Sequence, residues 1–258
     1  MEQTNNKPFV IFSYSGRFAH FLKAEASASA LSYPVPPRTV LLGLLGAVLG
    51  LSKDTPQLEL KGTMLALTGN RELQTHWHPA KLRKEIPTPL PRVVKVNMKG
   101  RNKRELATLI KQEWLIEPNY RVIASLPEAY HNDFVKRLKT KSWYYSPYLG
   151  LSEMNANLNF IAEVTGTAIR EKQPVRCQSV VPQDSVEIHG EGLEKYLKES
   201  QESLKIQILR MPYDLSEDRV FTHRNYLIER YGHPIPVLTS EAWNITTKTL
   251  GIFPIMFL

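Results

Sequence analysis

The segment from Ser32 to Leu51, SYPVPPRTVLLGLLGAVLGL, constrains the fold strongly, because three prolines lead directly into an apolar run. Proline fixes its own φ and pushes the residue before it toward extended geometry, so no helix is expected to begin before Pro37. Thr39 carries the hydroxyl of a typical N-cap. From Val40 to Leu51 no side chain is polar, which predicts a helix that is covered on nearly all sides.

Glycines recur on this helix at Gly43, Gly46 and Gly50. Each glycine lowers helix propensity by up to roughly 1 kcal/mol, so a compensating contact is expected. The sequence therefore predicts a stripe without side chains that lies close to a neighbouring backbone. The helix is too short to cross a bilayer, which takes about 20 apolar residues.

The start of this helix is a candidate anion site. Its unpaired N–H groups and the positive end of its dipole favour a phosphate, and Arg38 and Thr39 add a charge and a hydroxyl there. A purely structural alternative stays open at this point, in which Arg38 pairs with an acidic neighbour and Thr39 only caps the helix.

The formal charge of +8 is concentrated in one segment. Between residues 81 and 111 the basic side chains are Lys81, Arg83, Lys84, Arg92, Lys95, Lys99, Arg101, Lys103, Arg104 and Lys111, and the acidic ones are Glu85 and Glu105. Such concentration favours contact with a polyanion, as in nucleic-acid binding. The alternative is a solvated basic loop without a partner.

Composition is that of a folded intracellular protein. The 258 residues are enough for one large domain or two modest ones, and 42% are hydrophobic. The lone cysteine, Cys177, excludes an intrachain disulfide and suits a reducing compartment. The first dozen residues lack the pattern of a signal peptide, so we expect a cytoplasmic protein.

The order of elements predicts an α+β fold. Strands are expected at 8–14, 60–68, 120–126 and 159–169, and helices at 40–51 and 128–141. This β-α-β-β-α-β order is ferredoxin-like, an arrangement that RNA-recognition modules also use. Residues 71–112 would form an inserted β-hairpin within a domain at 1–169. Residues 170–258 are expected to form a smaller β-rich part.

Four segments together resemble the CRISPR-associated protein 5 family, which belongs to the RAMP superfamily. They are GRFAHFLK (16–23), SYPVPPRTVLLGLLGAVLG (32–50), EWLIEPNYRV (113–122) and YYSPYLGLSE (144–153). The likeness is greatest to the subtype I-B branch, whose members cap the 5′ handle of crRNA in the type I effector complex, Cascade. The last third of the chain adds little to this resemblance.

The resemblance implies a non-catalytic, cytoplasmic subunit that binds the crRNA 5′ handle without a cofactor. Its other partners would be the Cascade backbone subunit and the Cascade large subunit, with target DNA met only through the complex. The inserted hairpin at 71–112 would be the family's thumb. The implied RNA contacts are Arg17, His20, Lys23, Ser32, Tyr33, Arg38, Thr39, Arg92, Lys95, Lys99, Arg101, Lys103 and Arg104.

Two other functions remain open from the sequence. Metal-independent cleavage of precursor crRNA needs a general base, a general acid and a cation, which His20, Lys23 and Arg17 would supply, but the Lys-His pair of the cleaving branch is missing. General binding of single-stranded RNA is the second. A metal site is not expected, because His76 and His78 have no cysteine or carboxylate close to them in the sequence.

Overall fold

The computed structural model of the protein describes most of the chain. The described residues are 6–23, 29–69, 73–83, 107–200, 203–247 and 251–258. The predicted thumb contacts from Arg92 to Arg104 lie outside these residues, and so they stay predictions.

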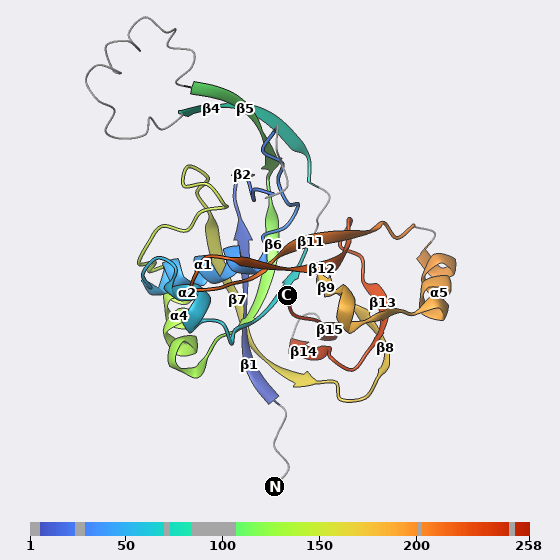
Figure 1. The fold of residues 1–258 in the computed structure, drawn as a ribbon. Coiled ribbons are helices and arrows are strands. Elements are labelled where there is room, and N and C mark those ends of the chain that lie inside the picture. The colour runs from blue at the N-terminus through green and yellow to red at the C-terminus, as the bar shows by residue number, and fades with distance from the viewer. Residues whose placement is uncertain (1–5, 24–28, 70–72, 84–106, 201–202, 248–250) are drawn as a thin grey trace, which may run out of the picture.

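A curled antiparallel sheet of six strands forms the centre of the molecule (Figure 1). Its order is β15-β14-β7-β1-β6-β3, and every pair of neighbours is antiparallel. The strands are β1 (Asn6–Ser15), β3 (Met64–Thr68), β6 (Asn119–Ser125), β7 (Asn157–Ala168), β14 (Trp243–Thr247) and β15 (Gly251–Ile255). The four strands expected from the sequence are therefore confirmed, with shifted ends.

Both faces of the central strands are buried, which explains the continuous apolar run in β1. Phe12 and Tyr14 belong to the main core between the sheet and the helices. Phe9 and Ile11 belong to a second core on the other face, with residues of β14 and β15. A strand buried on two sides has no polar face to alternate with, so the run PFVIF in the middle of β1 has no polar side chain.

The apolar helix α1 (Arg38–Leu49) begins one residue before its predicted cap. Pro37 is the N-cap, and its carbonyl accepts hydrogen bonds from the N–H groups of Val40 and Leu41 at 3.0 and 3.1 Å. Thr39 thus lies inside the first turn, and the prediction that it caps the helix is wrong. The cause is that Pro37 keeps an extended ψ of 159° while its carbonyl already faces the helix.

The predicted glycine stripe is closely packed at two of its three positions. Gly46 packs against Pro56 in the short helix α2 (Thr55–Glu59), where a Cβ on the glycine would lie 2.7 Å from the proline Cβ. Gly50 ends the helix with a φ of 84°, and a Cβ there would lie 2.6 Å from the ring of Tyr144. Gly43 has no atom within 4 Å of such a Cβ. Both close neighbours are side chains, so the expected approach of a neighbouring backbone is wrong.

Helix α4 (Glu128–Thr140) covers the same face of the sheet as α1. Phe134 and Leu138 are buried, as their spacing predicts, and the ring of Phe134 meets that of Phe12 with centroids 5.6 Å apart. No helix within the described ranges is long and apolar enough to span a membrane.

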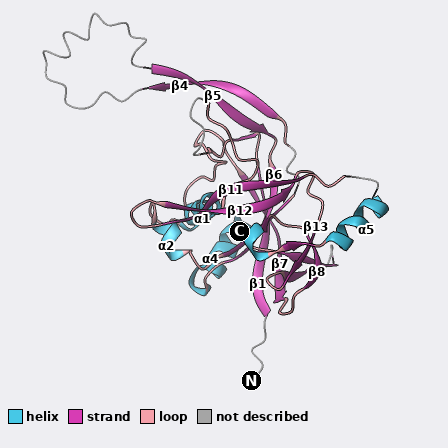
Figure 2. Cartoon of the chain, turned by 45° about the vertical axis from the view of Figure 1, so that its right-hand side comes forward, coloured by secondary structure: helices cyan, strands magenta, loops and turns pink. Residues whose placement is uncertain are grey.

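A long hairpin projects from the body, as Figures 1 and 2 show from two directions. Its arms are β4 (Thr75–Arg83) and β5 (Ala107–Ile116), paired from Thr75↔Leu115 to Arg83↔Ala107. The short strand β2 (Phe18–Ala19) pairs with the base of β5 and completes a three-stranded sheet. The two arms are connected by residues 84–106, which carry most of the basic side chains noted in the sequence.

The rest of the chain forms two small sheets and a helix. The sheets are β10-β13-β8 and β11-β12-β9. Their elements are β8 (Gln173–Cys177), β9 (Val181–Pro182), β10 (Glu187–Ile188), α5 (Gly190–Ser200), β11 (Ile206–Leu215), β12 (Phe221–Glu229) and β13 (Ile235–Thr239). Met211 and Tyr226 join the main core. The domain boundary expected from the sequence at residue 170 falls between β7 and β8. Strands β14 and β15 follow this boundary in the sequence but belong to the central sheet.

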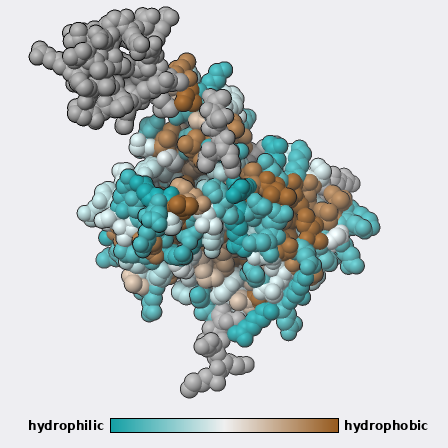
Figure 3. Space-filling view, in the orientation of Figure 1, coloured by the Kyte–Doolittle hydropathy of each residue, from teal (hydrophilic) through white to brown (hydrophobic). Residues whose placement is uncertain are grey.

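Apolar side chains gather on the surface near β12, β13 and α5 (Figure 3). Exposed residues of this part of the chain include Ile188, Leu197 and Ile208. The thiol of Cys177 is buried, with its Sγ 3.4 Å from the hydroxyl of Ser179.

Candidate nucleic-acid interface

The four segments that carry the sequence resemblance meet at the base of the hairpin. The first and third are joined by two backbone hydrogen bonds. The N–H of Gly16 donates to the carbonyl of Pro118 at 3.1 Å, and the N–H of Glu117 donates to the carbonyl of Arg17 at 2.9 Å. Residues about 100 positions apart are therefore held edge to edge.

The fourth segment closes against the first at Gly150. The N–H of His20 donates to the carbonyl of Leu149 at 3.1 Å. Gly150 has a φ of +92°, and a Cβ there would lie 2.8 Å from the carbonyl carbon of His20. Both the backbone conformation and the space require glycine at this position. The buried Tyr14 hydroxyl, whose pKa is raised by burial, donates to the carbonyl of Tyr148 at 2.8 Å.

Ser32 and Glu113 link the second segment to the hairpin. The Ser32 hydroxyl accepts a bond from the N–H of Phe21, and the N–H of Ser32 donates to the Glu113 carboxylate, both at 2.9 Å. The Nδ1 atom of His20 lies 2.8 Å from the Glu113 carbonyl. These bonds hold Ser32 and His20 in structural positions.

The seven predicted RNA contacts that the structure describes fall into two groups. Arg17 is exposed, and Lys23 is half-buried with its Nζ 5.7 Å from the centroid of the Tyr33 ring. The other five are buried, with exposed fractions of 8% or less: His20, Ser32, Tyr33, Arg38 and Thr39. Their accessibility thus favours Arg17 and Lys23 as RNA contacts. For the five buried residues RNA contact stays a prediction, because the bonds that the structure shows for them are internal to the protein.

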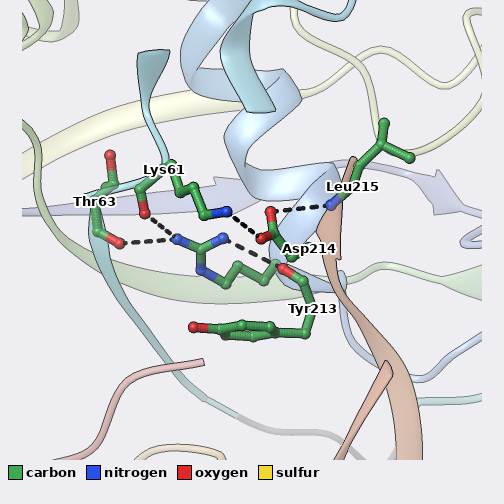
Figure 4. Close-up of polar contacts among 6 residues, drawn as sticks. Lys61, Thr63, Tyr213, Asp214 and Leu215 are labelled. Atoms are coloured by element: carbon green, nitrogen blue, oxygen red, sulfur yellow. Dashed lines mark hydrogen bonds and ion pairs between the residues drawn. The ribbon is translucent and has the colours of Figure 1, made fainter. Parts of the chain in front are cut away.

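Arg38 is held inside the protein by backbone carbonyls (Figure 4). Its side chain is 4% exposed, and its guanidinium donates to the carbonyls of Lys61 at 2.6 Å, Tyr213 at 3.3 Å and Thr63 at 3.4 Å. The guanidinium groups of Arg38 and Arg224 both lie over the Tyr213 ring, 5.1 and 5.6 Å from its centroid.

The nearby acidic residue pairs with a different cation. Asp214 forms its ion pair with Lys61 at 2.8 Å. Burial alone would raise the pKa of Asp214, but hydrogen bonds from Lys61 and the Leu215 N–H, with the charges of Lys61 and Arg38, lower it overall. Arg38 therefore joins α1 to β11 through the backbone carbonyl of Tyr213. The sequence had suggested either a phosphate site or a salt bridge for Arg38, and neither interpretation anticipated this bond.

A cavity of about 180 Å³ lies where the assembled segments, the hairpin and the C-terminal part meet. It is lined by Lys23, Ser32, Pro34, Leu73, Thr75, Glu113, Leu115, Gln207, Ile228 and Arg230. Lys23 and Arg230 bring two cations to it from residues about 200 positions apart. The Glu113 carboxylate also lines the cavity, where it accepts a hydrogen bond from the Ser32 N–H, so the two cations exceed the one anion. Two cations beside amide and hydroxyl groups suit a phosphodiester of a nucleic acid.

Sequence reasoning missed Gln207 and Arg230 at this cavity. Gln207 lies on β11 and Arg230 directly follows β12, in the part of the chain with little family resemblance. No local pattern distinguishes them from other surface residues, and only the fold brings them beside Lys23. In the described part of the chain no three His, Cys, Asp or Glu side chains are grouped as metal ligands.

Comparison with known structures bears on the fold. Two solved structures are similar in fold, each with a TM-score of 0.51. One, described as a CRISPR RNA-guided surveillance complex, is 14% identical and aligned over 88% of this chain and 91% of its own. The other, a CRISPR protein from Archaeoglobus fulgidus, is 12% identical and aligned over 95% and 98%. No curated protein sequence matches the chain.

The family assignment rests on the sequence. The model of the family described as CRISPR-associated protein (Cas_Cas5) matches residues 9–225, which include all four segments at the base of the hairpin. The resemblance predicted from those segments is confirmed at the level of the family. The chain belongs to the CRISPR-associated protein Cas5 family.

Proposed function

We propose that the protein binds the 5′ handle of crRNA as a subunit of a type I effector complex, Cascade. The observation that carries the proposal is the cavity at the base of the hairpin, where Lys23 and Arg230 converge beside the family's motif segments. Family membership and the fold similarity to a CRISPR RNA-guided surveillance complex support it.

The fold fits a RAMP subunit in more detail. We interpret β7-β1-β6-β3 as a ferredoxin-like sheet, because α1 connects β1 to β3 and α4 connects β6 to β7. On this interpretation β4 and β5 are the stem of the thumb. The thumb would face the backbone subunit, the large subunit would adjoin the same end, and target DNA would be met only through the complex.

Binding should be governed by phosphates. The chain carries a formal charge of +8, and the basic segment follows directly on β4. For single-stranded RNA, the logarithm of affinity should fall with the logarithm of salt by about 0.7 per phosphate neutralised. We place the protein in subtype I-B and in the cytoplasm, where its single cysteine would stay reduced.

We also propose that the protein binds without cleaving. In the cleavage alternative His20 is the general base, and this residue is 2% exposed with its Nδ1 beside the Glu113 carbonyl. Incubation of the protein with labelled precursor crRNA in EDTA should leave the RNA intact. A single cut upstream of the handle would overturn this part of the proposal.

Charge reversal at the cavity tests the binding site. The double variant Lys23→Glu/Arg230→Glu should lower handle affinity at least tenfold in a gel-shift assay at fixed salt. The double variant Lys136→Glu/Lys198→Glu, at exposed lysines on α4 and α5, is the control with the same change of charge and should change affinity less than threefold. Equal loss in the control and the cavity variant would mean that general charge, and not this cavity, binds the RNA.

A further inference from the structure

Arg230 brings its charge to the cavity from a tight turn at the end of β12. The N–H of Arg230 donates to the carbonyl of Lys205 at 3.1 Å, which extends the pairing of β11 and β12 by one residue. The N–H of Gly232 donates to the carbonyl of Glu229 at 3.3 Å, so Arg230 and Tyr231 are the central residues of the turn. Hydrogen bonds of the strand pair and of the turn thus fix the backbone of Arg230.

The strand register separates the residues at this end of the hairpin into two faces. Gln207 and Ile228 are paired and line the cavity, and Arg230, two positions after Ile228, lines it too. Glu229 and its partner Ile206 belong to the opposite face, where Ile206 packs against a cluster of buried apolar residues. Glu229 therefore lies behind the cavity, next to Arg230 in the chain, and is not one of the lining residues.

The side chain of Glu229 is a buried carboxylate that accepts hydrogen bonds from the backbone. It is 0% exposed. Its Oε1 atom accepts from the N–H of Lys205 at 3.0 Å, and its Oε2 atom accepts from the N–H of His233 at 2.7 Å. Burial of a carboxylate costs free energy unless hydrogen bonds satisfy it, so these bonds hold the group in place. One carboxylate thereby ties the residue before β11 to the residue after the turn.

The two residues that the carboxylate joins flank the turn that carries Arg230. The Nζ atom of Lys205 lies 4.7 Å from the centroid of the Tyr231 ring, and the rings of Tyr231 and His233 have centroids 6.0 Å apart. The turn is therefore ordered by side chains as well as by the backbone. A cation on a turn that is already ordered loses less conformational entropy when it binds a ligand.

We propose that Glu229 is a positioning residue for RNA binding, whose carboxylate holds the turn so that the side chain of Arg230 stays at the cavity. This rests on the proposed function and adds a residue that does not itself contact the RNA. Electrostatics alone predicts the opposite sign, because a carboxylate repels phosphate and its removal should strengthen binding. The two accounts therefore differ in the direction of the effect.

Substitution of Glu229 by the amide of the same shape separates the two accounts. Glu229→Gln removes the charge and places an N–H₂ group, which cannot accept a hydrogen bond, against one of the two backbone donors. Handle affinity in gel shifts should fall about threefold, and its logarithmic salt slope should decrease by about 0.7, the share of one phosphate. Glu194→Gln, at an exposed carboxylate on α5, has the same change of charge and is the control. It should leave the affinity within about twofold of the native value.

A double-variant cycle shows whether Glu229 acts through Arg230. Arg230→Ala alone should lower handle affinity about fivefold, and Glu229→Gln should cause no further loss when Arg230 is already alanine. Losses that multiply would overturn the proposal, because Glu229 would then act elsewhere. Higher affinity in Glu229→Gln would also overturn it in favour of simple repulsion. Native affinity in Arg230→Ala would instead refute the cavity contact on which the inference rests.

Thermal melting identifies the variants that fold, and binding is measured below the Tm of every variant. If Glu229→Gln does not fold, Glu229→Asp keeps the charge with a carboxylate one methylene shorter, and its loss of affinity should likewise vanish when Arg230 is alanine. Failure of both variants to fold would assign the carboxylate to the stability of the whole fold and overturn the proposal.

Discussion

Gly150 offers a stringent test of how the motif segments are assembled. Alanine there must adopt a φ of +92°, which costs about 1–2 kcal/mol for a residue with a Cβ. Its Cβ would also lie 2.8 Å from the carbonyl carbon of His20, so the two backbones must separate. Separation weakens the hydrogen bond from His20 to Leu149, which contributes about 0.5–1.5 kcal/mol. Together these effects predict that Gly150→Ala lowers the free energy of unfolding by roughly 1.5–3.5 kcal/mol.

For a chain of this size, 1 kcal/mol corresponds to about 2–4 °C in Tm, so the expected decrease is about 3–14 °C by calorimetry. Gly43→Ala is the matched control, since it lies in the interior of α1 with no atom within 4 Å of its Cβ. That variant should gain up to about 1 kcal/mol of helix propensity and melt slightly higher. A Gly150→Ala protein that melts within 1 or 2 °C of the native one (roughly 0.5 kcal/mol) would refute the packing described for this loop.

Three further predictions concern the joint between α1 and its neighbours. Arg38→Ala should lower the free energy of unfolding by about 1–3 kcal/mol in urea, because it leaves buried carbonyls unpaired; unchanged stability with weaker RNA binding would instead restore Arg38 as an RNA contact. Asp214→Asn should lower the free energy of unfolding at pH 7 by about 1 kcal/mol or less, and the difference should vanish in acid. Gly46→Ala should destabilise the protein by roughly 1–3 kcal/mol, since its Cβ would press on Pro56; a rise in Tm would contradict that contact.

The pH dependence at Asp214 follows from the direction of its shift. The pKa of its carboxyl is lower in the folded protein than in the unfolded chain, so the contribution to stability is present above the unfolded pKa. It is lost as pH falls through the folded pKa. Thermal melts of both proteins between pH 7 and pH 3 should therefore converge at the acidic end, and a gap that widens in acid would have the wrong sign.

Local pattern was sufficient for the elements with strong periodicity. The apolar run of β1, the proline lead-in to α1 and the spacing of Phe134 and Leu138 each have a single plausible secondary structure. Strand β13 was not predicted, because Ile235–Thr239 is short and contains a proline. The position of the helix start was missed by two residues, since Pro37 and not Thr39 is the N-cap.

The candidate site was harder to predict, because its residues come from distant parts of the chain. Arg38 looked like a free cation in its own segment, whereas its partners at Lys61 and Tyr213 lie 23 and 175 residues away. Arg230 reaches the cavity only through the pairing of β11 and β12. The ring contacts of Trp114 with Phe18 and His78 likewise depend on strand register that no single motif contains.

Competition between two RNAs tests the central claim most directly. A labelled crRNA 5′ handle is bound to the protein at fixed salt and displaced by unlabelled handle or by a scrambled RNA of the same length and composition. The account predicts that the unlabelled handle displaces the label at a concentration at least tenfold lower than the scrambled RNA does. Equal displacement by both would contradict handle recognition and leave a protein that binds single-stranded RNA in general.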